Sequence, residues 1–406
     1  MSQSRATKLD RHKDEDLVLG RYRLLHNGLL GEGGWCMVRR AVDLTGCAVA
    51  VKAFKPQAEK EVGREALQKR FQREVKAFHD IGIGPGSKEG AQEIDPRGYF
   101  VNLLDFSGFD SSPPPSVNCR CYTVLEIGDQ SLDDWLQRGA VSLSGFCELA
   151  KALFKALKWL HGLGFIHMDV KPENIMRFGT RWKLIDLDCC MSCNDEMVTP
   201  ENFTPLYASP ELAREVLDTL EMDNPATRKL RPCPAMDIWA AGVVLLDVLA
   251  EGCCFAETKA SFDAAALFEE EGIPFEGWYR WLASCDPLDV DDLLSGTPGA
   301  VHLQDARLRS LLHGALAKEP KSRLSAERLY DKLLEISTSP GRPAVERVFR
   351  AVGEAEPEQY STDALLEVMI LVGVAPREAN RILEALDRQL GRRTLSYTAF
   401  LDFLYQ

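Results

Sequence analysis

The sequence predicts an α+β fold in which a small β-rich region with one main helix is followed by a larger helical region. The stretch 21–54 has a β-like pattern, and shorter runs at 99–106 and 121–127 also have the composition of strands. Further along the chain, apolar residues recur at three- and four-residue steps, which is typical of helices. Small and helix-breaking residues at 337–343 indicate a linker to a final all-helical unit, 344–406.

The elements can be assigned in order. In the β-rich region, 21–127, the strand at Cys47–Phe54 is followed by a predicted helix over Glu59–His79. The region 128–336 is predicted to be mainly helical, with short strands and loops over His167–Leu187. Six of its stretches have helical apolar spacing: Leu132–Arg138, Ser144–Leu163, Ala235–Ala250, Ala264–Glu270, Arg307–Ala317 and Ser325–Ile336.

The composition indicates a globular protein of several domains. The chain has 406 residues, of which 45% are hydrophobic and 27% charged, and this length allows roughly two to four domains. The 48 basic and 61 acidic side chains give a net charge of −13. This charge argues against a chain whose main role is to bind nucleic acid or an anionic membrane.

The same features predict where the protein works. Its 12 cysteines are too few for a disulfide-rich secreted scaffold. The polar N-terminal tail, residues 1–20, lacks the apolar core of a signal peptide. The longest apolar stretch, Trp239 to Ala250, contains Asp247 and is too short to cross a bilayer. We therefore expect an intracellular, cytoplasmic protein with reduced thiols and no membrane span.

A glycine-rich turn lies among the first strands. Its residues fit the pattern G-x-G-x-x-G-x-V at Gly31, Gly33, Gly34 and Val38, but Cys36 replaces the third glycine. Glycines at such a turn let backbone N–H groups approach phosphate oxygens. The turn alone is a weak signal, because an ordinary β-turn has a similar composition.

A lysine after this turn strengthens the nucleotide interpretation. Lys52 comes directly after the run Ala48–Val51 in the strand that follows. A strand-borne lysine can pair with the α- and β-phosphates if a carboxylate holds it in place. Glu74, within the predicted helix, is the best-placed partner. Glu61, Glu65 and Glu93 are poorer candidates, because they lie at the frayed start of that helix or outside it.

The strongest signal is the block His167-Met-Asp169-Val-Lys171-Pro-Glu173-Asn174. Six specified residues give on the order of 10⁻⁵ chance matches over this length. A carboxylate such as Asp169 can accept a proton from a substrate hydroxyl, and Lys171 can neutralise a transferring phosphoryl group. Asn174 and the later Asp186 supply the oxygen ligands that Mg²⁺ prefers beside ATP phosphates. Mn²⁺ could use the same ligands.

Taken in this order, the motifs resemble those of a eukaryotic serine/threonine protein kinase over residues 21–336. The resemblance implies a bilobal protein-kinase fold, with an N-lobe and hinge at 21–127 and a C-lobe at 128–336. The stretch Thr204–Glu211 resembles the end of the activation segment, and Arg323 looks like the arginine that pairs with Glu211.

The resemblance also implies the roles of individual residues. Leu125 matches the gatekeeper beside the hinge, and Lys171 together with Thr204 is similar to the serine/threonine branch. The implied catalytic residues are Asp169, Lys171, Lys52 and Glu74, and the implied metal ligands are Asn174 and Asp186. The implied nucleotide-binding residues are Gly31, Gly33, Gly34, Val38, Ala50, Lys52, Glu126, Ile127 and Met176.

Four positions depart from the family pattern. Met168 replaces the arginine that pairs with a phosphorylated activation loop, which implies activity less dependent on such phosphorylation. Cys36 and Asp188 replace glycines, and Asp188 adds charge beside the metal site. Leu187 for phenylalanine keeps an apolar side chain. Because the proton-transfer, lysine and metal-ligand positions remain, the sequence favours a protein kinase that uses ATP and Mg²⁺. The alternatives are a pseudokinase or nucleotide-binding scaffold that signals by conformation, and a structural adaptor.

Two weaker patterns concern substrate choice and redox chemistry. The window 261–300 holds nine acids against one base. With Glu173, which resembles a family position that selects basic residues, it suggests a preference for basic protein substrates. Cys189, Cys190 and Cys193 follow the metal-site aspartate. They read first as free, partly buried thiols and second as a redox-sensitive group, whereas a zinc site would need four ligands.

The final unit contains a repeat. The segments that begin at Tyr360 and Leu395 align at a 35-residue offset, each after an apolar helix. This spacing resembles a pair of EF-hands, as in calcium-dependent protein kinases. The loops at Gly353–Gln359 and Arg388–Thr394 lack alternating oxygen ligands. The sequence therefore predicts a calcium-silent EF-hand-like pair with a docking or regulatory role, and an unrelated four-helix unit is the alternative.

Overall fold

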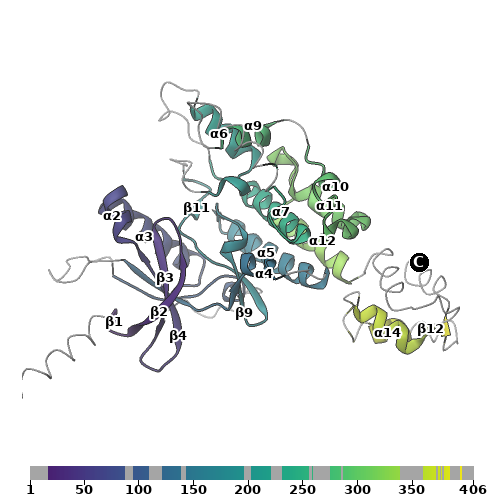
Figure 1. Ribbon diagram of the computed structural model, residues 1–406, viewed down its shortest axis with the longest axis horizontal. Helices are drawn as coiled ribbons and strands as arrows, with labels where there is room; N and C mark the ends of the chain where they lie inside the picture. The colour runs from purple at the N-terminus through teal and green to yellow at the C-terminus, as the bar shows by residue number, and fades with distance from the viewer. Residues whose placement is uncertain are drawn as a thin grey trace, which may run out of the picture. The chain divides into compact units, whose positions relative to one another are not determined.

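The computed structural model describes two compact units of the chain (Figure 1). The first takes its residues from 1–132, 159–168 and 172–192, and the second from 133–158, 169–171 and 193–406. The residues described are 17–86, 95–108, 121–138, 143–195, 203–220, 231–255, 258, 275–284, 287–338, 360–371, 374, 376, 379–384 and 394–395.

A six-stranded antiparallel sheet dominates the first unit (Figure 1). Its strands, in spatial order, are β1 (Leu17–Val18), β2 (Tyr22–Glu32), β3 (Cys36–Val42), β4 (Ala48–Phe54), β6 (Tyr122–Glu126) and β5 (Leu103–Phe106). Val49, Val51 and Val124 pack in a core on this sheet. The predicted strand at Tyr99–Phe106 is shorter than expected, because Phe100 instead forms an isolated parallel bridge with Leu184.

Two helices follow β4, where the sequence predicts one. The first is α2 (Pro56–Val62) and the second is α3 (Arg64–Asp80), and Figure 1 shows both beside the sheet. Gly63, with φ 83°, separates them. An α-helix needs negative φ, and glycine adopts positive φ without a steric penalty, so the chain turns at this residue. The buried face of α3 contains Phe71, Val75 and Phe78, and Glu74 lies on the same face.

Two small sheets complete the first unit. One joins β7 (Gln130–Ser131), β9 (Ile175–Phe178) and β10 (Arg181–Leu184), and the other joins β8 (Phe165–Ile166) to β11 (Met191–Ser192). The short helix η2 (Pro172–Asn174) leads directly into β9. The sequence predicts short strands and loops over His167–Leu187, and these elements confirm that prediction.

The second unit is mainly helical, as the sequence predicts (Figure 1). The helices are α4 (Leu132–Leu136), α5 (Leu143–Gly162), α6 (Pro210–Leu220), α7 (Pro234–Ala250), α9 (Glu276–Ala283), α10 (Val290–Leu293), α11 (Ala306–Ala315) and α12 (Ala326–Thr338). The first residue of α4 and the last turn of α5 are grouped with the first unit. Five of these, α4, α5, α7, α11 and α12, confirm predicted helices to within two residues. The sixth prediction, Ala264–Glu270, lies outside the described residues.

Helix α7 is buried along nearly its whole length, from Met236 to Leu249. A helix that is apolar all round has to be covered on every side, and α7 packs against α11 and the 3₁₀ helix η6 (Pro298–Gln304). A methyl group added at Gly242 would lie 2.8 Å from Leu316 Cδ2, so this glycine permits the close approach of the helices.

The described residues of the C-terminal segment include α14 (Thr362–Leu371) and a two-residue antiparallel pair, β12 (Tyr360–Ser361) with β13 (Thr394–Leu395). Tyr360 is paired with Leu395, so one pair of residues that align in the sequence repeat are also partners in the structure. Most of the two predicted loops lies outside the described residues. Within the described ranges, no helix has both the length and the apolar character needed to cross a bilayer.

Candidate active site

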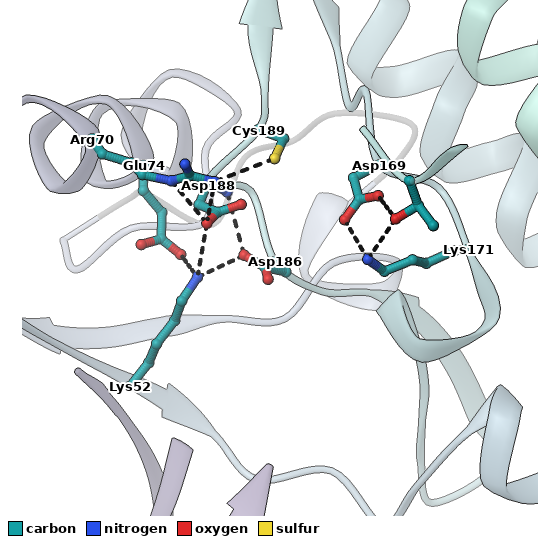
Figure 2. Close-up of polar contacts among 9 residues, drawn as sticks. Lys52, Arg70, Glu74, Asp169, Lys171, Asp186, Asp188 and Cys189 are labelled. Atoms are coloured by element: carbon teal, nitrogen blue, oxygen red, sulfur yellow. Dashed lines mark hydrogen bonds and ion pairs between the residues drawn. The ribbon is translucent and has the colours of Figure 1, made fainter. Parts of the chain in front are cut away.

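Lys52 is the centre of a charged cluster in the first unit (Figure 2). It lies in β4, and its side chain is 8% exposed. Its Nζ donates hydrogen bonds to Oε1 of Glu74 at 2.8 Å and to Oδ1 of Asp186 at 2.6 Å. The structure therefore brings Lys52 together with the partner that the sequence favours. Of the poorer candidates, Glu65 pairs instead with Lys69 on the surface of α3.

Burial and charge act in opposite directions on this cluster. Burial alone would lower the pKa of Lys52, but the carboxylates of Asp186 and Glu74 raise it well above its ordinary value. Burial raises the pKa of Glu74, and the ammonium of Lys52 opposes this shift. The lysine thus remains a cation in a place from which water is largely excluded, where its attraction for phosphate oxygens is strong.

Asp186 follows β10 with a backbone that is unusual for a non-glycine residue. Its φ is 62°, and Met168 has φ 71°. Such left-handed angles are uncommon outside glycine and tend to occur at functional sites, where the surrounding structure maintains them. The Asp186 side chain is 34% exposed, so its carboxylate is open to a ligand while Lys52 holds one of its oxygens.

Asn174 and Asp186 fit a site for Mg²⁺. The Ile185 N–H donates to the Asn174 carbonyl at 2.9 Å, which brings the residue before Asp186 against Asn174. Both side chains offer oxygen ligands, which a hard divalent cation prefers. The buried Asn174 and the more open Asp186 could therefore hold the metal from two adjacent segments.

The glycine-rich turn joins β2 to β3, and β3 is the neighbour of the strand that carries Lys52. Gly31 in β2 is paired with Val38 in β3, and Val38 is paired in turn with Lys52 in β4. At the turn, the Gly33 N–H donates to the carbonyl of Cys36 at 2.9 Å. Methyl groups added at Gly31 or Gly34 would meet nothing within 4 Å. There is open space at these positions, as a ligand-covering turn requires.

Other predicted nucleotide-binding residues lie on three strands of the first unit, β4, β6 and β9. Ala50 in β4 is paired with Leu125 in β6, which is buried. Met176 lies in β9, and a methyl group added at Gly128 would come within 2.2 Å of its Sδ. A larger residue in place of Gly128 would therefore require the Met176 side chain to move.

The side chain of Glu126 fixes the hinge. Its Oε1 accepts hydrogen bonds from the backbone N–H and the Nδ2 of Asn102, each at 2.8 Å, and it also pairs with the buried ammonium of Lys183. The family resemblance implies a nucleotide-binding role for Glu126. The structure adds that its carboxylate ties its own strand to Asn102 and Lys183.

A second cluster lies within the second unit and contains Asp169 (Figure 2). Lys171 Nζ is 2.8 Å from Oδ2 of Asp169, and it donates to Oγ1 of Thr204 at 2.9 Å. The same hydroxyl donates to Oδ1 of Asp169 at 2.7 Å. Both oxygens of the Asp169 carboxylate are therefore oriented by neighbours, one by a cation and one by a hydroxyl.

Comparison with protein families decides the identity of the chain. The model of the protein kinase domain matches residues 97–333, which is more than half of the chain. The chain belongs to the protein kinase family. The β-sheet of its first unit and the helices of its second fit the bilobal fold of these kinases. The match begins after Lys52 and the glycine-rich turn, so the interpretation of these residues rests on the contacts described above.

Curated relatives agree on the type of kinase. Serine/threonine-protein kinase ppk34 of Schizosaccharomyces pombe is 25% identical over 338 residues, which cover 78% of this chain and 83% of that protein. The serine/threonine-protein kinase H1 homolog of Pinctada fucata is 24% identical over 307 residues, covering 73% and 62%. Probable serine/threonine-protein kinase PknB of Bifidobacterium longum is 30% identical over 248 residues, covering 57% and 30%. The chain thus spans less than two thirds of the last two relatives. By these matches it is a serine/threonine protein kinase.

The kinase also contains the expected ion pair at the end of the activation segment. Arg323 donates to Oε1 and Oε2 of Glu211 at 2.6 and 2.7 Å, and its side chain is fully buried. Its guanidinium also lies over the ring of Trp239, 5.1 Å from the centroid. This pair anchors the start of α6 within the second unit.

Sequence reasoning missed two contributors to these clusters. Arg70 contacts Asp188, and Lys183 holds Glu126. Arg70 precedes Glu74 by four residues, so the two share one face of α3. Once Glu74 is placed beside Lys52, this spacing is a signal that Arg70 faces the same region. No comparable signal in the sequence links Lys183 to Glu126.

Proposed function

We propose that this kinase transfers the γ-phosphoryl group of ATP to serine or threonine hydroxyls of protein substrates, with Mg²⁺ as the metal. The observation that carries the proposal is the buried Lys52, held between Glu74 and Asp186 at hydrogen-bond distance. A cation fixed in this way can orient ATP phosphates without having to rearrange. The glycine-rich turn between β2 and β3 would cover those phosphates.

The roles of the other residues follow from their contacts. Asp169 would accept the proton of the substrate hydroxyl, since Lys171 and Thr204 already orient its two oxygens. Lys171 would then stabilise charge on the transferring group. Asn174 and Asp186 would hold Mg²⁺, which when bound supplies positive charge to the phosphate oxygens.

A preference for basic substrates is part of the proposal, and Glu173 is its main support. Its side chain is exposed within the segment that follows Lys171. The acidic window 261–300 supports it less, since several of its described acids have local partners: Glu276 pairs with Arg280 and Asp291 with Arg309. A library of peptides that vary in charge before the target hydroxyl tests this preference. Selection of acidic or proline-containing peptides would remove it.

The test of the activity compares the purified wild type with Asp169→Asn in Mg-ATP, on broad peptide and protein panels. We expect phosphate transfer by the wild type, and a rate lower by about 10²-fold or more in the variant. If the wild type is no faster than the variant, the proposed activity fails and the scaffold alternative is favoured. Thermal-shift measurement of Mg-ADP binding then shows whether that scaffold still takes a nucleotide. The same assay with Mn²⁺ tests the metal.

For the segment 344–406 we propose a docking or regulatory role through a calcium-silent EF-hand-like pair. Its support is the backbone pairing of Tyr360 with Leu395, which joins equivalent positions of the sequence repeat. Deletion of residues 344–406 should leave transfer to short peptides intact and reduce the retention of protein partners. Equal retention by the full and shortened chains would contradict this role.

A further inference from the structure

Asp188, which stands where the family pattern has glycine, is paired with an arginine from α3. Oδ2 of Asp188 accepts a hydrogen bond from Nε of Arg70 at 3.1 Å and forms an ion pair with Nη2 of the same residue at 3.0 Å. The side chain of Asp188 is 16% exposed and that of Arg70 is 19% exposed. The same Oδ2 lies 4.0 Å from Nζ of Lys52. Asp188 therefore accepts from one cation and faces a second, as Figure 2 shows.

Arg70 also contacts the glycine-rich turn. Its guanidinium lies over the ring of Trp35, 4.6 Å from the centroid. The carbonyl of Trp35 in turn accepts a hydrogen bond from the N–H of Lys55, at 2.8 Å, just after β4. Nη2 of Arg70 further contacts Sγ of Cys189 at 3.6 Å. We call Trp35, Arg70, Asp188 and Cys189 the Arg70 cluster.

The Arg70 cluster connects the three segments that the reaction needs in register. These are the glycine-rich turn, the helix that carries Glu74, and the loop that carries Asp186. All of these residues belong to the first unit. Arg70 lies one helical turn before Glu74, and Asp188 lies two residues after Asp186. The backbone N–H of Asp188 also points to Oδ1 of Asp186, with a long N–O distance of 3.4 Å.

The backbone at Asp188 does not require glycine, since its φ is not in the positive range that favours that residue. A carboxylate can stand here without conformational strain, and the negative charge it adds is directed at Arg70. Hydrogen bonds between charged groups in a partly buried place are stronger than those between neutral groups or on an open surface. A planar guanidinium can donate to a carboxylate while it stacks on an aromatic ring, which an ammonium cannot do as well.

We propose that Arg70 is a positioning residue for phosphoryl transfer, which holds Glu74 and Asp186 in register by binding Asp188 and Trp35. This inference rests on the proposed function and extends it. It gives Asp188 a role and supplies an anchor for α3. In this chain Met168 stands where the family pattern has the arginine that pairs with a phosphorylated activation loop, so such an anchor could take over part of that function.

The kinetic test uses variants of Arg70 and a matched control on the same helix. Arg70→Met removes the charge and largely keeps the length of the side chain. Arg70→Lys keeps the charge but lacks the planar guanidinium with its several N–H donors. Lys69→Met makes the same change in charge at an exposed position of α3. We expect Arg70→Met to lower kcat about tenfold with little change in the KM for the peptide, Arg70→Lys to recover part of the loss, and Lys69→Met to match the wild type.

Asp188→Gly, which installs the residue of the family pattern, provides the second variant. Because it removes the group that Arg70 binds, we expect it to lower kcat as well. In the double variant Arg70→Met/Asp188→Gly the two losses should not add. Additive losses would show that Arg70 does not act through Asp188, and a fully active Arg70→Met would overturn the proposal.

A third measurement does not depend on activity. Hydrogen exchange, followed by mass spectrometry on the nucleotide-free protein, reports how firmly α3 is held. We expect amides of residues 71–80 to exchange several-fold faster in Arg70→Met than in the wild type or Lys69→Met, at a temperature where all three are folded. Unchanged exchange would contradict the positioning role. If the wild type proved inactive, the proposed function would fail while this measurement would still decide the inference.

Discussion

The hydroxyl of Thr204 donates a hydrogen bond to Oδ1 of Asp169 at 2.7 Å and accepts one from Lys171 at 2.9 Å. One side chain thus orients both the proposed base and its neighbouring cation. We predict that Thr204→Val lowers kcat about tenfold, because the shape is kept and both hydrogen bonds are lost.

Thr204→Ser is the matched control for this prediction. It keeps the hydroxyl and removes only a methyl group, so kcat should stay close to the wild-type value. Rates measured on one peptide at saturating Mg-ATP check both variants. A fully active Thr204→Val would show that the hydroxyl does not orient Asp169 during the reaction.

The ion pair between Arg323 and Glu211 should contribute strongly to stability. The Arg323 side chain is fully buried and donates to both carboxylate oxygens and to three backbone carbonyls. Removing one partner leaves a buried charge and several acceptors unpaired. We predict that Arg323→Met lowers the free energy of unfolding by about 3 kcal/mol, measured by urea denaturation.

An exposed pair provides the comparison. Arg309 and Asp291 are 2.9 Å apart, with side chains 39% and 50% exposed. Arg309→Met should cost only about 0.5 kcal/mol. Equal losses in Arg309→Met and Arg323→Met would contradict the assignment of the buried pair as an anchor of α6.

The thiol of Cys36, where the glycine pattern is broken, should be unreactive. Burial raises its pKa to about 12, although Lys52 partly opposes the shift. At pH 8 only about one thiol in 10⁴ would be ionised, and the thiolate is the reactive form. We predict that iodoacetamide at pH 8 modifies the exposed Cys47 well before Cys36, as followed by peptide mass spectrometry.

The sign of this shift gives a pH dependence. A raised pKa keeps the thiol protonated through neutral pH, so modification of Cys36 should increase only as the solution becomes strongly alkaline. Labelling of Cys36 at the rate of Cys47 at pH 8 would show that the glycine-rich turn opens readily in solution.

Calcium should have no effect on this kinase. The predicted loops lack the carboxylates and carbonyl spacing that hold Ca²⁺. With Mg²⁺ held constant, about 1 mM Ca²⁺ should leave both the thermal midpoint and the rate of the full chain as they are in chelator. A higher midpoint with Ca²⁺, but not with the same amount of added Mg²⁺, would overturn the calcium-silent interpretation.

The parts of the fold that follow from local pattern could be predicted from the sequence. The mainly apolar run Ala48–Phe54 forms β4, and the mainly apolar stretch after Pro234 forms the buried α7. The break at Gly63 could not be predicted, since a single glycine within a helical pattern is usually tolerated. Only its positive φ in the folded chain shows that it separates two helices.

The candidate site divides in the same way. Lys52, Asp169 and Asp186 could be named because each belongs to a short motif with fixed spacing. The contact between Arg70 and Asp188 joins residues 118 positions apart, and nothing local in the sequence pairs them. From the sequence alone, the charge of Asp188 appears unfavourable. The folded structure supplies the arginine that neutralises it.

The left-handed backbone of Met168 and Asp186 has a practical consequence for protein engineering. Each non-glycine residue at such angles costs roughly 1 kcal/mol relative to glycine. Met168 is buried in the core, so glycine there would lose more in packing than it gains in backbone freedom. At 186, by contrast, a selection for thermostability alone would favour glycine and so remove the carboxylate that contacts Lys52. Any directed evolution of this kinase toward greater stability therefore needs a catalytic readout in every round.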